Sequence, residues 1–396
     1  MKKILAPVLA LLMLVNLSGC YDVEEISYTV AAIALGIDKG ESSKYRVSFH
    51  IEKAGSNEEE EEEDKDKGGK KSGLITVEAP TVSSAYEMVN DLSSVHVSID
   101  NLKMVILSEA ISKEGIYPVI SELMCDMNLK NNAYVAVTDS EAESVMEKIV
   151  PEDEEYLSIF YQRILYKRYK AETKYFLIEE LYFNMLSEPG QDVMLPMARL
   201  EKETVPPGRL KSGILPEDGE YEVAFSGGAA FSGDKLAGYL SDDDMMAASL
   251  IYGDYKTEKI SVEYPEGSGK YVIAEIAQQK RPERKTLIRS GRVHDDTVLY
   301  LIATYQFADE SESFGEFNPD FEKYLKKEIV KICLGFVDKT VRTYGADTLS
   351  IGKRLKKSFL KNSDYSDFYS KEKIRNGDYS VTVRLNMKTG GRFVFR

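Results

Sequence analysis

The sequence lacks the residue groupings on which most catalytic and metal sites depend. Its three histidines, His50, His96 and His294, are far apart, and none has a second His or a Cys at the spacing of metal ligands. The segment Gly267-Ser268-Gly269-Lys270 resembles the end of a phosphate-binding loop, but tyrosines replace the loop's first Gly and its Ser or Thr. A Gly-x-Ser-x-Gly motif is also missing. The sequence therefore indicates no enzyme, no cofactor and no metal site.

Positive charge and cysteine are also scarce. The 51 Lys and Arg residues face 66 Asp and Glu residues, which gives a formal net charge of −15. Such a surface repels phosphate groups, so it argues against nucleic acid as a partner and against electrostatic adhesion to anionic lipid. Of the 3 cysteines, Cys125 and Cys333 lie in apolar helical contexts. We expect both to be buried free thiols, with a disulfide as the alternative.

No apolar run reaches the length of a membrane-spanning helix, which needs about 20 residues. The apolar run at 4–17 follows Lys2 and Lys3 and predicts a signal peptide at 1–19. It ends in Leu17-Ser18-Gly19-Cys20, which resembles a bacterial lipobox, where diacylglycerol is attached to the Cys sulfur before cleavage. Two acyl chains on Cys20 would give stable anchoring to the bilayer. The alternative is a plain secreted protein with a coincidental Cys at this position.

Composition shifts divide the mature chain, whose length predicts two or three domains. We expect an N-terminal α+β domain at 20–196, a Pro-containing linker at 197–220, and a C-terminal α+β region at 221–396 with room for two smaller domains. The acidic segment 56–72 includes an unbroken run of Glu at 58–63 and predicts a disordered loop. Calcium binding there is disfavoured because Gly68 stands where an EF-hand needs an oxygen ligand.

The first half predicts strands that alternate with helices. Strands at 28–37 and 45–51 form a hairpin, and further strands are expected at 73–79, 103–108 and 132–138, with a βαβ unit and a partly parallel sheet. Ser140 and Glu143 fit a capping box, and later helices are expected at 154–169 and 173–186. A helix after Thr81 has an apolar face, formed by Val82, Ala85, Tyr86, Val89 and Leu92.

The second half predicts a less regular mixture. Strands are expected at 221–231, 235–239, 257–264, 270–276, 284–291, 297–307, 379–385 and 392–395. The run Asp242-Asp243-Asp244 suits the cap and dipole of a helix better than it suits a metal site. A long helix begins at Asn318-Pro319 and ends at Gly345, with an apolar face of Phe321, Leu325, Ile329, Ile332 and Phe336. The fold class is therefore α+β, with mixed sheets flanked by helices.

One basic stretch, within a shorter helix at about 349–360, stands out on this acidic chain. We expect it to be a solvated helix face, with docking of an acidic partner loop or of lipid headgroups as the alternative. Its members are Lys353, Arg354, Lys356, Lys357 and Lys361.

Several segments together resemble the Ger(x)C family, the C-subunit lipoproteins of spore germinant receptors. They occur in the family's order over nearly the whole mature chain, although Tyr21 replaces the usual Trp. These segments are Gly19-Cys20-Tyr21-Asp22 with Glu25, Gly36-Ile37-Asp38, 103–115, Val193-Met194-Leu195-Pro196, 228–231 with 234–240, Ala346-Asp347 and Ile351-Gly352.

The resemblance implies an elongated, non-enzymatic α+β lipoprotein, anchored through Cys20 on the outer face of the spore inner membrane. It would assemble there with a polytopic A subunit and a transporter-like B subunit that sense nutrients, and only Cys20 carries over as a site residue. A solute-binding lipoprotein of an ABC-type transporter is the alternative, and an enzyme acting on the cell wall is a third. The solute-binding class needs two similar lobes, which the irregular second half does not suggest.

Overall fold

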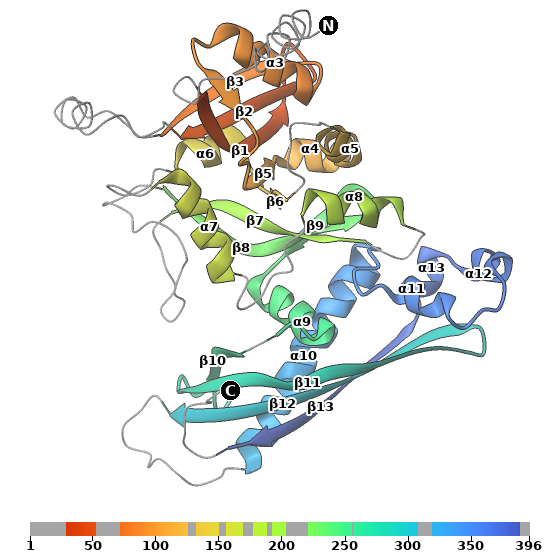
Figure 1. The fold of residues 1–396 in the computed structure, drawn as a ribbon. Helices are drawn as coiled ribbons and strands as arrows, with labels where there is room; N and C mark the ends of the chain where they lie inside the picture. The colour runs from red at the N-terminus through yellow and green to blue at the C-terminus, as the bar shows by residue number, and fades with distance from the viewer. Residues whose placement is uncertain are drawn as a thin grey trace, which may run out of the picture.

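The computed structural model describes residues 29–52, 72–125, 132–149, 156–168, 177–187, 192–202, 221–255, 257–307 and 319–388. These residues form an elongated α+β molecule with one large mixed sheet and, at the other end, a smaller sheet (Figure 1). The predicted fold class is confirmed. The signal peptide at 1–19, Cys20, most of the acidic segment 56–72, the predicted helix cap Asn318 and the predicted strand 392–395 lie outside the described residues.

The large sheet has the strand order β3-β2-β1-β5-β6-β7-β8-β9, with β4 pairing beside β5 on β1. Strands β1 to β3 are antiparallel, as the predicted hairpin requires, whereas β1, β5 and β6 are parallel, as a βαβ unit requires. The strands are β1 (Thr29–Lys39), β2 (Tyr45–Glu52), β3 (Ser72–Ala79), β4 (His96–Ser98), β5 (Met104–Leu107), β6 (Tyr134–Val137), β7 (Met194–Lys202), β8 (Tyr221–Ser232) and β9 (Lys235–Leu240).

Helices cover both faces of the first strands, so β1 and β5 are apolar on both faces and supply two separate cores. The helix after Thr81 is confirmed, with Val82, Ala85 and Val89 buried, but Leu92 is 77% exposed instead of continuing the buried face. The helices are α3 (Val82–Leu92), α4 (Glu109–Glu114), α5 (Tyr117–Cys125), α6 (Ala142–Glu147), α7 (Leu157–Arg168) and α8 (Ile178–Leu186).

The predicted capping box of Ser140 and Glu143 is wrong, because a carboxylate from β1 takes its place. Asp38 is buried, and its two oxygens accept hydrogen bonds from the amides of Ala142 (2.8 Å) and Glu143 (2.9 Å). Ser140 instead lies 3.0 Å from the Thr138 hydroxyl. A charged acceptor at the first amides also complements the dipole of α6, so Asp38 ties this helix to the sheet.

The smaller sheet has the order β10-β11-β12-β13, with β13 parallel to β12 and the other pairs antiparallel. The strands predicted at 270–276 and 284–291 are one long strand, because the ladder with β12 continues past a shift in register near Lys280. The elements of this half are α9 (Asp242–Tyr252), β10 (Thr257–Glu263), β11 (Tyr271–Arg289), β12 (Arg292–Phe307), α10 (Pro319–Val337), η2 (Asp338–Thr343), α11 (Ile351–Lys356), α12 (Asn362–Phe368), α13 (Lys371–Arg375) and β13 (Asp378–Met387).

Helix α10 packs on one face of the smaller sheet, as its apolar face predicts. Phe321, Leu325, Ile329 and Phe336 are buried, and Cys333 replaces the predicted Ile332 as the fully buried residue in that turn. The π-helical turn η2 extends α10, and Gly345 follows with a φ of 63°, a backbone conformation that favours glycine.

The linker predicted for 197–220 begins inside a strand. Residues up to Lys202 belong to β7, which pairs antiparallel with β8 from Met194↔Ala230 to Lys202↔Tyr221. The prolines on which the linker prediction rested include Pro196, which β7 accommodates at a shift in register. Residues 203–220 lie outside the described residues. The strands β7 and β8 therefore belong to a single sheet.

We expect the acidic segment to be dispensable for stability. Strands β2 and β3 remain paired up to Glu52↔Ser72, so the chain between them joins two strand ends that are already held together. Replacing residues 57–71 with a short Gly-Ser link should change the free energy of unfolding by less than about 1 kcal/mol, because loop length contributes weakly. Thermal and urea unfolding of both chains would measure the difference. A melting temperature lower by many degrees would mean that the acidic run packs against the folded protein.

Candidate functional site

The histidines do not assemble a reactive site. His50 is buried on β2, with its Nδ1 atom 3.2 Å from the Tyr161 hydroxyl, and burial lowers the pKa of His50 to about 4. Its imidazole is therefore neutral at pH 7 and serves as a core side chain. Within the described ranges, no three His, Cys, Asp or Glu side chains lie together in a way that could hold a metal ion.

The three aspartates at the start of α9 lie in its first turn, where they complement the helix dipole, and Asp244 also takes part in the cap, as predicted. Ser241 and Asp244 form a capping box, and Asp242 Oδ1 accepts a hydrogen bond of 2.6 Å from the Gly227 amide. The Lys339 ammonium group lies 2.6 Å from the Asp244 carboxylate, and this ion pair links η2 to α9. These carboxylates therefore stabilise the helix start and its contact with the C-terminal half.

The two described cysteines are free thiols with different surroundings. Cys333 is buried, as predicted, and burial raises its pKa to about 12. The predicted burial of Cys125 is wrong, since this residue ends α5 and is exposed, while Val119, Ile120 and Leu123 form the buried face of that helix.

A polar cluster joins the large sheet to the C-terminal half. We call it the carboxylate junction, and its members are Asp192, Ser232, Asp347 and Lys371. Asp192 precedes β7, and its Oδ1 accepts from the Gly233 amide at 2.7 Å. Its Oδ2 accepts from the Asp347 amide, also at 2.7 Å. Lys371 on α13 bonds both Asp192 oxygens at 3.2 and 2.9 Å and Ser232 Oγ at 2.7 Å. One buried carboxylate thus connects three separate segments.

Asp347 is the second carboxylate of the junction and is 2% exposed. Its two oxygens accept hydrogen bonds of 2.7 Å from the amides of Ile351 and Gly352, so it caps α11. Burial, and then the nearby charge of Asp192, raise the pKa of Asp347 to about 7 against the lowering effect of the two amides. The junction therefore contains a group that can hold a proton near neutral pH.

Tyr344 presses the C-terminal half directly onto the edge strand β9. Its hydroxyl donates a 2.9 Å hydrogen bond to the carbonyl of Tyr239, and its ring lies over Gly238. A Cβ atom at Gly238 would overlap that ring, so only glycine allows this close approach.

The predicted basic stretch separates into one half-buried residue that turns inward and several outer ones. Arg354 turns inward and is not part of a solvated face: it bonds Asp295 Oδ1 (2.7 Å), Thr286 Oγ1 (2.7 Å) and the Leu349 carbonyl (2.6 Å). Arg284 reaches the same carbonyl at 3.0 Å, and burial followed by the neighbouring Arg354 lowers its pKa to about 10. Asp295 is 2% exposed. This pairing fixes α11 on the β11–β12 hairpin because a buried charge must be paired.

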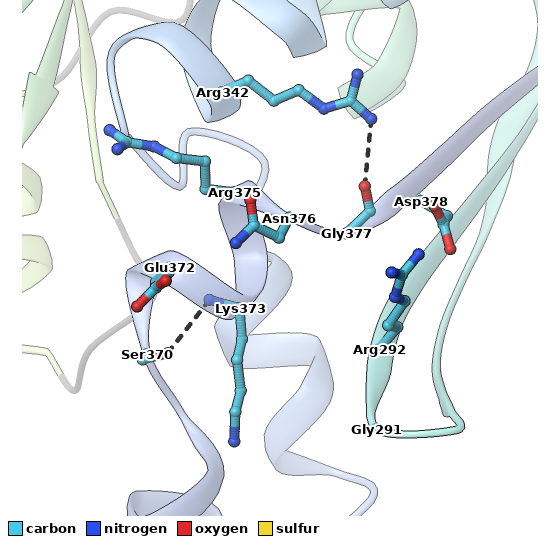
Figure 2. A pocket seen from close by; sticks show the side chains of 10 residues that line it. All are labelled: Gly291, Arg292, Arg342, Ser370, Glu372, Lys373, Arg375, Asn376, Gly377 and Asp378. Atoms are coloured by element: carbon cyan, nitrogen blue, oxygen red, sulfur yellow. Dashed lines mark hydrogen bonds between the residues drawn. The ribbon is translucent and has the colours of Figure 1, made fainter.

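A surface hollow of about 820 Å³ lies beside the tip of that hairpin (Figure 2). Arg342 closes one side by donating to the Gly377 carbonyl at 3.2 Å. Figure 2 shows the guanidinium groups of Arg292 and Arg375 on opposite sides and the Lys373 side chain leading away from both. Because these cations do not meet at one point, the hollow does not define a binding site for an anion.

The sequence named one residue of the junction, Asp347, without its role and missed the other three. Asp347 lies in a segment of the family resemblance, whereas Asp192, Ser232 and Lys371 drew no prediction. Asp192 stands directly before the apolar Val193-Met194-Leu195, and a charged residue beside an apolar strand is the signal that could have identified it. Its partners are more than 40 positions away in the chain, so no local pattern could predict them.

Comparisons with known proteins match both halves of the chain. The family described as "Spore germination protein N-terminal domain" matches residues 22–200, and the one described as "Spore germination B3/ GerAC like, C-terminal" matches residues 226–391. The chain is 24% identical over 360 residues to the putative spore germination protein YfkR of Bacillus subtilis (strain 168), covering 86% of this chain and 89% of that protein.

Two further relatives agree with these matches. The spore germination protein GerQC of Bacillus cereus is 20% identical over 297 residues, covering 73% of this chain and 75% of that protein. The crystal structure of the GerBC protein has a TM-score of 0.50 and 14% sequence identity, covering 92% of this chain and 99% of that chain. The last comparison shows similarity of fold.

The carboxylate junction predicts a specific dependence of stability on pH. Because the pKa of folded Asp347 lies above the value of about 4 for an unfolded Asp, its contribution is present at low pH and is lost as the pH rises to about 7. Urea unfolding between pH 4 and 8 should therefore show the stability of the wild type falling relative to Asp347→Asn, by on the order of 1.4 kcal/mol per unit of pKa difference. The exposed Asp367→Asn should follow the wild type. Parallel curves for wild type and Asp347→Asn would contradict this assignment.

The contact between Tyr344 and β9 predicts a cost for any side chain at position 238. Gly238→Ala should lower the free energy of unfolding by about 1–3 kcal/mol, because the Tyr344 ring must move. Gly335→Ala is the matched control: apart from its chain neighbours and the backbone of its own helix, no atom lies within 4 Å of its added Cβ, and alanine favours the helix by up to about 1 kcal/mol. Adding Tyr344→Ala should make the Gly238→Ala change nearly neutral in a double-mutant cycle. Equal costs of Gly238→Ala with and without Tyr344 would refute the contact.

Proposed function

This chain belongs to the Ger(x)C family of spore germination proteins, and on that premise we propose that it is a non-enzymatic lipoprotein subunit of a nutrient germinant receptor. In this role it acts with polytopic A and B subunits on the outer face of the spore inner membrane. The match of family models to both halves, over residues 22–200 and 226–391, is the observation that carries the proposal.

Attachment to the membrane is assigned to Cys20. Within the described residues, no helix is both long enough and apolar enough to cross a bilayer. A diacylglycerol thioether on Cys20 provides two acyl chains, which suffice for stable anchoring. Anchoring confines the protein to the surface where its membrane partners lie, so weak contacts are enough for assembly.

The architecture of the described residues suits a protein that presents surfaces. Its buried carboxylates are satisfied by amides and cations between segments, as at Asp192 and Asp295, and neither of these two lines the hollow of Figure 2. Buried polar networks of this kind fix the relative positions of the segments that they join, which supports a structural role in a complex.

The rival proposal, a solute-binding lipoprotein of an ABC-type transporter, lacks support from the fold. That class needs two similar lobes around a ligand cleft. Here the large sheet mixes parallel and antiparallel strands in the order β3-β2-β1-β5-β6-β7-β8-β9, whereas the smaller sheet has four strands.

Replacing the anchoring residue tests the proposal. Cys20→Ala should block lipidation and cleavage together and should reduce the germination response of spores to nutrients, because the subunit is no longer concentrated by its lipid. Mass spectrometry of the protein from the membrane fraction would measure the N-terminus, and a nutrient-response assay would measure function. Exposed Cys125→Ser, which removes a thiol elsewhere, is the control and should behave as the wild type.

Two results would argue against this function. A wild-type N-terminus without diacylglycerol contradicts the anchor. A Cys20→Ala protein that stays fully anchored and supports normal germination contradicts the need for it. Co-purification of the wild-type protein with the A and B subunits tests the assembly itself.

A further inference from the structure

The start of β1 marks one end of the large sheet. Thr29 and Val30 pair with His96 and Val97 of β4, and Ala31 pairs with Glu52 at the end of β2. Ser72, the first residue of β3, pairs with the same Glu52. The N-terminus of β1, the whole of β4, the end of β2 and the beginning of β3 therefore meet at a single edge of the molecule.

Helix α3 brings exposed apolar side chains to this end. Its last residue, Leu92, is 77% exposed, and Met88, one turn earlier on the same face, is 38% exposed. The Asn90 side chain accepts a 2.8 Å hydrogen bond from the Val97 amide, so the end of α3 is fixed against β4. Leu92 is thus held in an exposed position beside the first residues of β1.

Helix α7 does the same on the other face of the sheet. Ser158 donates from its amide and its hydroxyl to Glu52 Oε1, both at 3.3 Å, which places the start of α7 beside the end of β2. Tyr156 and Ile159, on either side of this serine, are each 42% exposed. Four of the nine large apolar side chains exposed in the described chain therefore lie at this one end, which we call the apolar end: Met88, Leu92, Tyr156 and Ile159.

The chain leading to β1 limits how far this end can be from Cys20. Thr29 is nine positions after Cys20, and a fully extended chain covers at most about 3.6 Å per position, or roughly 32 Å. Real chains are shorter, so a lipid on Cys20 keeps the start of β1 close to the bilayer surface. The opposite ends of these strands, where Asp38 caps α6, must point away from it.

We propose that the apolar end rests on the bilayer surface, with Met88, Leu92, Tyr156 and Ile159 in the boundary between headgroups and acyl chains. This inference depends on the proposed lipidation of Cys20, which holds the two surfaces together. Transfer of apolar side chains from water to this boundary lowers the free energy, and tyrosine suits the polar outer part of the boundary. Glu87 directly precedes Met88 and Asp91 directly precedes Leu92, so anionic lipid does not attract this end electrostatically. The contact is apolar and insensitive to salt.

The experiment measures the depth of single labelled positions in the membrane. The lipidated full chain with Cys125→Ser, which leaves only buried Cys333 as a free described thiol, is reconstituted into vesicles of phosphatidylethanolamine and phosphatidylglycerol. Leu92→Cys and Ile159→Cys are each labelled with an environment-sensitive fluorophore. Leu360→Cys, at a fully exposed leucine in the C-terminal half, is the matched control.

Lipids with a nitroxide near the headgroup should quench the fluorophores at positions 92 and 159 at least twofold and leave the one at 360 unchanged, at both low and high salt concentration. Flotation of the vesicles reports the anchor separately. If the protein floats but the labels at 92 and 159 are not quenched, this inference is wrong and the anchor stands. The same holds if these labels become protected from water only after the partner subunits are added. Protein that does not float, or carries no diacylglycerol, overturns the anchor and with it the inference.

Discussion

Strands β7 and β8 are apolar on both faces, and the rest of the structure depends on covering both. Along β7, Leu195 enters the core of the large sheet while its neighbour Met194 enters the core of the C-terminal half. Along β8, Ala229 and Ala230 divide in the same way. Because alternate residues of a strand point to opposite faces, neither face can be left to water without exposing a row of apolar side chains. The two halves of the chain are therefore parts of one folding unit at this sheet.

Because two cores pack against the same sheet, polar groups are buried where the two halves of the chain meet. Asp192 stands at this contact and would be costly to bury alone, but the amides of Gly233 and Asp347 and the ammonium group of Lys371 satisfy it. Asp347 in turn accepts hydrogen bonds from the first amides of α11. Arg354, on the same helix, pairs with Asp295 and so links α11 to the β11–β12 hairpin. Each group is satisfied by a segment distant in sequence, so the network has a defined geometry only in the assembled fold.

Local patterns in the sequence predicted much of this structure, and two of the errors share one cause. The β1–β2 hairpin, the apolar face of α10 and the capping role of Asp244 follow from periodicity and neighbouring residues, and all three are present. The cap of α6 comes from Asp38, which is 104 positions away from Ala142. Strand β7 is stabilised by pairing with β8, which follows it after the Pro-containing segment 203–220. Such long-range partners override local signals, and the junction around Asp192 consists almost entirely of them.

The contact between the two halves has a mechanical consequence for a protein that is attached to a membrane at one end. On the proposed anchorage, the lipid fixes only the start of β1, and a single tether leaves the orientation of everything beyond it free. The continuous sheet from β1 to β9, the Tyr344 ring over Gly238 and the bonds of Asp192 remove that freedom within the chain itself. The proposed second contact at the bilayer, through exposed side chains such as Leu92, would remove it relative to the membrane. Together, the two constraints would set the height and direction of the C-terminal sheet, as the proposed receptor subunit would need in order to present one surface to its partners.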